Sequence, residues 1–78
     1  MSIPSGIYQH FKGSYYKVLD IARHSESEEE YVIYRPLKGD SGTWIRPLHM
    51  FQESVERDGV IQPRFKYLGP DTQSIEET

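Results

Sequence analysis

Four neighbouring side chains of this sequence are of the types that carry out proton transfer. They are Arg23, His24, Ser25 and Glu26, at the end of a long strand-like run. Histidine titrates near neutral pH, and a carboxylate, a hydroxyl and a guanidinium beside it would suit general acid–base chemistry. The structural alternative is a strand end whose serine and glutamate fix the following loop through local hydrogen bonds. We favour this alternative, because a catalytic set also needs a pocket and a second cluster of functional groups.

Two other groups of side chains are suited to binding. Tyr8, His10 and Lys12 alternate along the chain, so on a strand they would share one face and offer a platform for a nucleobase or a phosphate. The alternative is that this face is the solvent side of an edge strand. Trp44 could stack on a ligand, and Arg46 could hold a carboxylate or phosphate with two parallel hydrogen bonds.

A structural role is also open to Trp44 and Arg46. A domain this small needs its largest side chain for burial, so Trp44, the only tryptophan, would anchor the core. Arg46 would then pair with an acidic residue such as Glu53. We favour this structural role on the grounds of size.

The three histidines, His10, His24 and His49, are the candidate metal ligands. Their spacing matches no zinc signature and includes no His-x-x-x-His pair. The chain has no cysteine, which excludes disulfides and thiolate ligands. It has neither a Gly-rich phosphate loop nor a Gly-x-Ser-x-Gly elbow. We therefore predict no metal, no cofactor and no catalytic residue.

The formal net charge of −3 over 78 residues conceals an uneven distribution. Seven of the twelve acidic residues lie between Glu26 and Glu30 or in the tail from Asp71 onward, and the rest of the chain carries a balance of +4. A mildly basic body permits an anionic ligand without requiring one. No apolar run approaches the roughly 20 residues that span a bilayer, and the first residues do not form a signal peptide. We expect a cytoplasmic protein without membrane contact.

Short strand-like runs and turn signals alternate along the chain, as in small β-barrels. The expected strands are Ile7–Lys12, Tyr15–His24, Tyr31–Leu37, Thr43–Arg46 and Phe65–Leu68, with a hairpin in Val55–Val60 around Asp58-Gly59. Pro47–Glu53 suits one helical turn. We predict a single domain over residues 1–68, mostly β, built as a small SH3-like β-barrel of five or six short strands with one short helical turn. Residues 69–78 are predicted to be a disordered acidic tail.

The longest run has no clean apolar face. A β-bulge near Leu19 and Asp20 would shift the alternation so that Tyr16, Val18 and Ile21 all face inward. Aspartate also tolerates the left-handed backbone that a bulge can require.

Several motifs together resemble bacterial domain of unknown function family 1653. They are Gly6-Ile7-Tyr8, His10-Phe11-Lys12-Gly13, Tyr16-Lys17-Val18, Ile21-Ala22-Arg23-His24-Ser25-Glu26, Val32-Ile33-Tyr34, Gly39-Asp40, Trp44-Ile45-Arg46-Pro47 and Met50-Phe51. The resemblance covers about residues 6–65, and Asp20 departs from it where the family often has glycine. It implies a small, mostly β bacterial domain and supplies neither an activity nor catalytic residues.

These observations favour a non-catalytic binding module for an anionic ligand, nucleic acid or peptide. The candidate ligand-binding residues are Tyr8, His10, Arg23, His24, Glu26, Trp44 and Arg46. We expect them to converge on one polar surface of a monomer or weak homodimer. The alternatives are a small enzyme that uses the cluster from Arg23 to Glu26, or a structural or oligomer-forming protein that associates through strand edges.

Overall fold

The computed structural model describes residues 3–39 and 42–75, and strands dominate them. In chain order the elements are β1 (Gly6–His10), β2 (Tyr15–Arg23), β3 (Glu30–Pro36), β4 (Trp44–Pro47), α1 (Leu48–Phe51), β5 (Ser54–Arg57), β6 (Val60–Pro63), β7 (Phe65–Gly69) and a 3-10 turn (Thr72–Ile75). The mostly β prediction and the single helical turn after Pro47 are confirmed.

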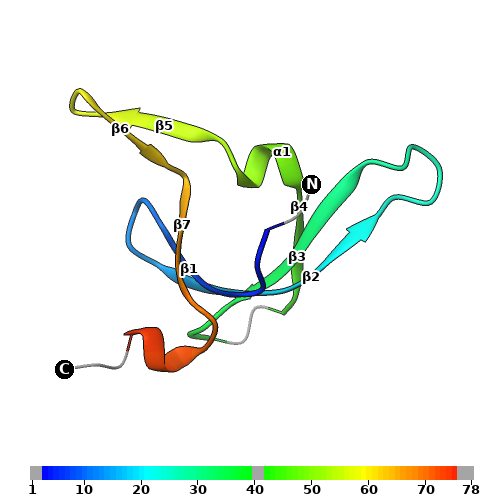
Figure 1. Cartoon of the computed structure of the whole chain (residues 1–78), viewed down its shortest axis with the longest axis horizontal. Helices are drawn as coiled ribbons and strands as arrows, with labels where there is room; N and C mark the ends of the chain where they lie inside the picture. Colours follow the sequence, from blue (N-terminus) through cyan, green and yellow to red (C-terminus); the bar gives the residue numbers. More distant parts are fainter. Residues whose placement is uncertain (1–2, 40–41, 76–78) are drawn as a thin grey trace.

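The main sheet is open. Its strand order is β4-β3-β2-β1-β7, and all neighbours are antiparallel, so β4 and β7 are two edges that do not pair with each other. The predicted closed SH3-like barrel is therefore not confirmed. After β4 the chain turns into α1 and then forms a separate hairpin, β5–β6, before it returns as β7 (Figure 1). This hairpin raises the strand count among the described residues above the predicted five or six.

A β-bulge interrupts β2, as predicted. The pairing of β2 with β3 shifts register between Val18 and Asp20, which leaves Leu19 exposed. Val18 is only 1% exposed, and Ile21 packs against the core from beyond the bulge. Asp20 does not need a left-handed backbone here, and its carboxylate instead accepts a hydrogen bond from the Ile21 N–H at 2.7 Å.

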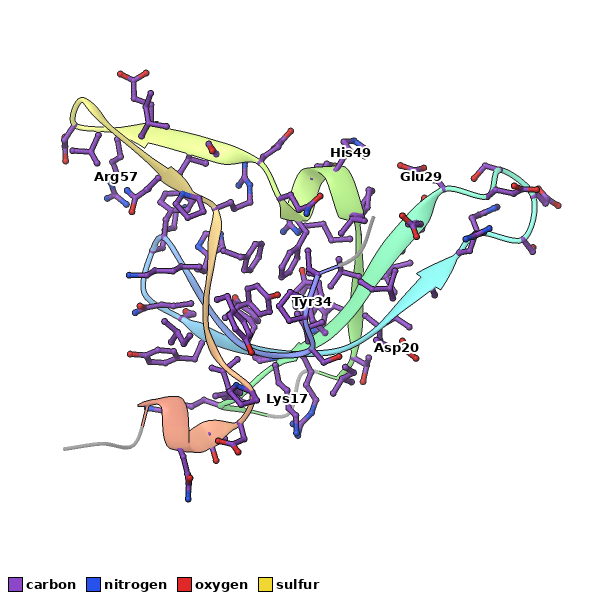
Figure 2. The ribbon with its side chains drawn as sticks, in the orientation of Figure 1. Lys17, Asp20, Glu29, Tyr34, His49 and Arg57 are labelled. Atoms are coloured by element: carbon purple, nitrogen blue, oxygen red, sulfur yellow. The ribbon has the colours of Figure 1, made fainter. Side chains whose placement is uncertain are left out.

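The core lies between the concave face of the sheet and α1. Its buried members are Tyr8, Val18, Val32, Tyr34, Leu48, Phe51 and Phe65. The rings of Phe51 and Phe65 stack at 4.0 Å, and Figure 2 shows Tyr34 pointing from β3 toward α1. Helix α1 thus supplies the central aromatic anchor. Trp44 is 51% exposed, so its expected core role is wrong.

Residues 69–75 are part of the described structure. Gly69 pairs with Ile7 in the sheet, Gly69 and Ile7 are buried, and residues 72–75 form the 3-10 turn on the side of the sheet away from α1 (Figure 1). The predicted disorder of the tail falls partly on residues 76–78, which lie outside the described residues.

Candidate functional site

The cluster from Arg23 to Glu26 lies at the tip of the β2–β3 hairpin, and its side chains are exposed. The His24 Nδ1 accepts hydrogen bonds from the backbone N–H groups of Glu26 at 3.1 Å and Ser27 at 3.2 Å. Glu28 adopts a left-handed backbone with φ 64°, and its N–H donates to the His24 carbonyl. These contacts are those of a tight turn, in which His24 caps the loop.

Tyr8 does not line a surface. Its side chain is 4% exposed and packs edge to face on Phe51, and its hydroxyl donates to the Pro4 carbonyl at 2.7 Å. Burial, with a further contribution from the neighbouring Tyr67, raises the pKa of the Tyr8 hydroxyl to about 12. Tyr8 is therefore a core residue, and the expected platform with His10 and Lys12 does not form.

Three of the predicted residues do converge. His10, Trp44 and Arg46 line one hollow of about 310 Å³. The remaining lining residues are Tyr16, Tyr34, Pro36, Lys38 and Phe65. The hollow thus has mostly aromatic walls and two cationic side chains, and no acidic residue of the described chain lines it. Its volume is at the lower end of the range for small-molecule pockets, about 300–1,000 Å³.

Arg46 is held in this hollow by aromatic side chains. Its Nε donates to the Tyr34 hydroxyl at 3.3 Å, and its guanidinium carbon lies 5.6 Å from the centre of the Phe65 ring. The expected pairing with Glu53 is wrong, because Glu53 binds the guanidinium of Arg64 at 3.3 Å. Within the described chain, no carboxylate lies within 4.0 Å of Arg46. The guanidinium is thus positioned while part of its hydrogen-bonding capacity stays available.

His10 adds a neutral polar group to the same hollow. Burial lowers its pKa below the ordinary value, and the nearby charges of Arg64, Arg46 and Lys12 lower it further. Its Nδ1 accepts a hydrogen bond from the Lys12 backbone N–H at 3.1 Å. A neutral imidazole that accepts at Nδ1 carries its proton on Nε2, so His10 has one N–H to offer an acceptor.

Trp44 forms one rim of the hollow. It lies opposite Tyr34 in the β3–β4 ladder, half exposed, near the edge of the sheet. Among the described aromatic residues, no ring lies close enough to stack on it. A large apolar side chain left exposed beside a cation is typical of a contact surface rather than of a core.

Sequence reasoning missed Tyr16, Tyr34, Phe65 and Lys38. The place of Tyr34 in the hollow could have been predicted, since a short turn between β3 and β4 places Tyr34 near Trp44. The place of Phe65 in the hollow could not be predicted in this way. It depends on the pairing of β7 with β1, two strands that lie far apart in the sequence.

The acidic side chains gather elsewhere. A shallow hollow beside α1 is lined by Glu29, Glu30 and His49, with the His49 Nδ1 at 3.4 Å from a Glu29 carboxylate oxygen. Figure 2 shows these two side chains facing each other above the sheet. No group of three or more potential metal ligands occurs in the part of the chain that the structure describes, and none of its helices is long and apolar enough to cross a bilayer.

Comparisons with known proteins found one matching protein family and a similar solved structure. A family model described as "Protein of unknown function (DUF1653)" matches residues 6–67. The crystal structure of a DUF1653 protein from Bordetella bronchiseptica is similar to this chain, with 35% sequence identity and a TM-score of 0.80. The match covers 88% of this chain and 91% of that one. A comparison with curated proteins gave no match.

Proposed function

This chain belongs to the DUF1653 family, whose function is unknown, and we propose that it is a non-catalytic binding module for an anionic ligand that carries a planar ring. The observation that supports this proposal is the state of Arg46. Its guanidinium is fixed by Tyr34 and Phe65 in an aromatic-walled hollow, with no carboxylate of a described residue on it. A cation left without an acidic partner in a partly desolvated site is suited to a carboxylate or phosphate.

The walls of the hollow favour a ligand with a ring over a simple ion. Trp44 presents a half-exposed indole next to Arg46, and a flat ring could stack on it. Lys38 adds a second positive charge, and the His10 N–H adds a neutral donor. Among the described residues, the lining of this hollow includes no serine, threonine or cysteine and no carboxylate to orient His10, which favours binding over catalysis.

The alternative enzyme built on Arg23, His24 and Glu26 has less support. These residues lie at an exposed hairpin tip, and the His24 Nδ1 is occupied by two backbone N–H groups. None of the three lines the hollow that holds Arg46.

Fluorescence of Trp44 tests the proposal directly, because it is the only tryptophan. Uridine monophosphate is titrated into the protein, with uridine and inorganic phosphate as partial ligands. We expect a saturable change with the nucleotide, and a weaker one with either part alone. Arg46→Gln should weaken nucleotide binding about tenfold or more, the scale of one charge-assisted hydrogen bond. Arg23→Gln, at the exposed hairpin tip, is the matched control and should bind like the natural chain.

Two results would overturn the proposal. One is the absence of any saturable change at millimolar nucleotide. The other is equal nucleotide affinity in Arg46→Gln and Arg23→Gln. Thermal melting of both variants without ligand shows whether a loss of binding reflects a loss of folding.

A further inference from the structure

A second hollow continues from the first along the sheet. It has a volume of about 510 Å³, lies at the β1–β2 turn, and is lined by Lys12, Tyr15 and the turn backbone. The two hollows share Tyr16, Pro36 and Lys38, so they meet at these side chains. Together they form one extended surface, which we call the aromatic–basic groove: Lys12, Tyr16, Lys38, Trp44 and Arg46.

Both hollows of the aromatic–basic groove contain cationic and aromatic side chains. Lys12 lies in the second hollow, Arg46 in the first, and Lys38 lines both. Trp44 is 51% exposed and lines the first hollow, while Tyr16, which points to the same face of the sheet as Trp44, lines both. No acidic residue among those described lines either hollow, so the charged side chains of their described lining are all basic.

We propose that the aromatic–basic groove binds single-stranded nucleic acid across both hollows. The proposal rests on the proposed function of the first hollow and names its ligand class. Proteins that bind single strands combine a positive groove along the backbone with aromatic side chains on which successive bases stack. Trp44 and Tyr16 supply two such rings, and the three cations supply the backbone contacts. The strand occupies about four nucleotides, the lower end for small single-strand-binding folds.

The rings favour nucleic acid over an acidic peptide. An acidic peptide would use the cations but would leave the indole and phenol faces without flat partners. Each base has a π-face, so a strand uses both kinds of group. The groove is also short and bounded by the sheet edge, which suits a flexible strand better than a duplex.

The position of the acidic side chains favours one direction from which a nucleic acid would approach the groove. The acidic loop at residues 26–30 forms the tip of the β2–β3 hairpin, and the β1–β2 turn lies at the opposite end of the molecule (Figure 1). A polyanion is repelled from one end and attracted to the other, which orients its encounter with the groove.

The test measures fluorescence anisotropy of a fluorescein-labelled uridine octanucleotide at 50 mM salt, beside the Trp44 titration with uridine monophosphate. We expect the octanucleotide to bind at least tenfold tighter than the mononucleotide. With three phosphate contacts, raising the salt from 50 to 200 mM should weaken octanucleotide binding roughly 15- to 20-fold. Trp44→Ala should weaken it several-fold or more, in keeping with one stacked base.

A pair of lysine variants separates the two hollows. Lys12→Gln removes a charge from the second hollow only, so it should weaken the octanucleotide about threefold or more and leave the mononucleotide unchanged. Lys17→Gln is the matched control, because Lys17 points to the other side of the sheet (Figure 2) and lines neither hollow. Lys17→Gln should bind both ligands like the natural chain.

The outcomes are distinguishable. If the mononucleotide binds and the octanucleotide binds no tighter, the groove proposal is wrong while the function of the first hollow stands. The groove proposal is equally wrong if Lys12→Gln and Lys17→Gln behave alike, or if octaglutamate competes as well as unlabelled octanucleotide. If neither nucleotide ligand binds, both proposals fail together.

Discussion

The Arg46 guanidinium is fixed by the Tyr34 hydroxyl, which accepts a hydrogen bond from Nε at 3.3 Å. Tyr34 is a core residue, 4% exposed, and Arg46 lies on the neighbouring strand, opposite Val32. The contact therefore connects the buried aromatic cluster to the candidate binding site. A hydroxyl in the core determines where a cation at the surface can point.

Tyr34→Phe tests this connection. We expect a loss of about 0.5–1.5 kcal/mol of unfolding free energy, because one hydrogen bond is removed and the ring stays. Nucleotide affinity should fall several-fold, since Arg46 gains rotational freedom that binding must then remove. Urea denaturation and Trp44 fluorescence measure the two effects. Tyr31→Phe is the matched control, because it removes a hydroxyl that contacts Glu29 far from the hollow, and it should leave affinity unchanged.

Gly6→Ala should be one of the most destabilising small substitutions in the chain. Gly6 has φ +136°, and a Cβ there would collide with the Gly69 carbonyl oxygen and lie 2.9 Å from the Pro70 Cα. Backbone strain and the displacement of β7 together should cost about 2–4 kcal/mol. Gly13 has a similar φ of +112°, but a Cβ added there would have no atom within 4 Å. The loss of unfolding free energy in Gly13→Ala therefore measures backbone strain without a collision. Equal losses for the two variants in urea denaturation would contradict this account.

Acidic pH should destabilise the protein through His10. Its pKa is below the ordinary 6.5, first because of burial and then because of Arg64, Arg46 and Lys12. Between the two pKa values the unfolded chain binds more protons than the folded chain, so the unfolding free energy is full above pH 6.5 and falls as the pH drops below it. Urea denaturation of His10→Asn at pH 7.5 and 5.0 should show a smaller decrease than the natural chain. An equal decrease in both proteins would mean that His10 is not responsible.

Ending the chain at Leu68 should lower the melting temperature. This truncation removes Gly69, the partner of Ile7, and Ile7 is completely buried. For a domain of this size, about 1 kcal/mol corresponds to a shift of roughly 4–8 °C. A chain ended at Pro70 keeps the pair with Ile7 and lacks the 3-10 turn, so the difference between the two truncations gives the contribution of the pair. An unchanged melting temperature in the chain that ends at Leu68 would show that the pairing of Gly69 with Ile7 does not contribute to stability.

Local features of this fold were readable from the sequence. The Asp58-Gly59 turn appears as predicted, with positive φ at both residues and Arg57 paired to Val60. The bulge next to Leu19 and the helical turn after Pro47 were also predicted correctly. Each depends on a few consecutive residues, whose backbone preferences and alternation of apolar side chains act within one element.

The composition of the candidate site was decided by tertiary structure. The sequence singled out both Arg23 and Arg46, but β2 carries Arg23 out to a hairpin tip while β4 keeps Arg46 beside the core. Phe51 and Phe65 are buried and stack on each other in the core, while Trp44 is half exposed. That stacking requires β7 to pair with β1, at the other end of the chain. Local patterns carry no information on such a pairing, because its free energy comes from burying side chains that are distant in sequence.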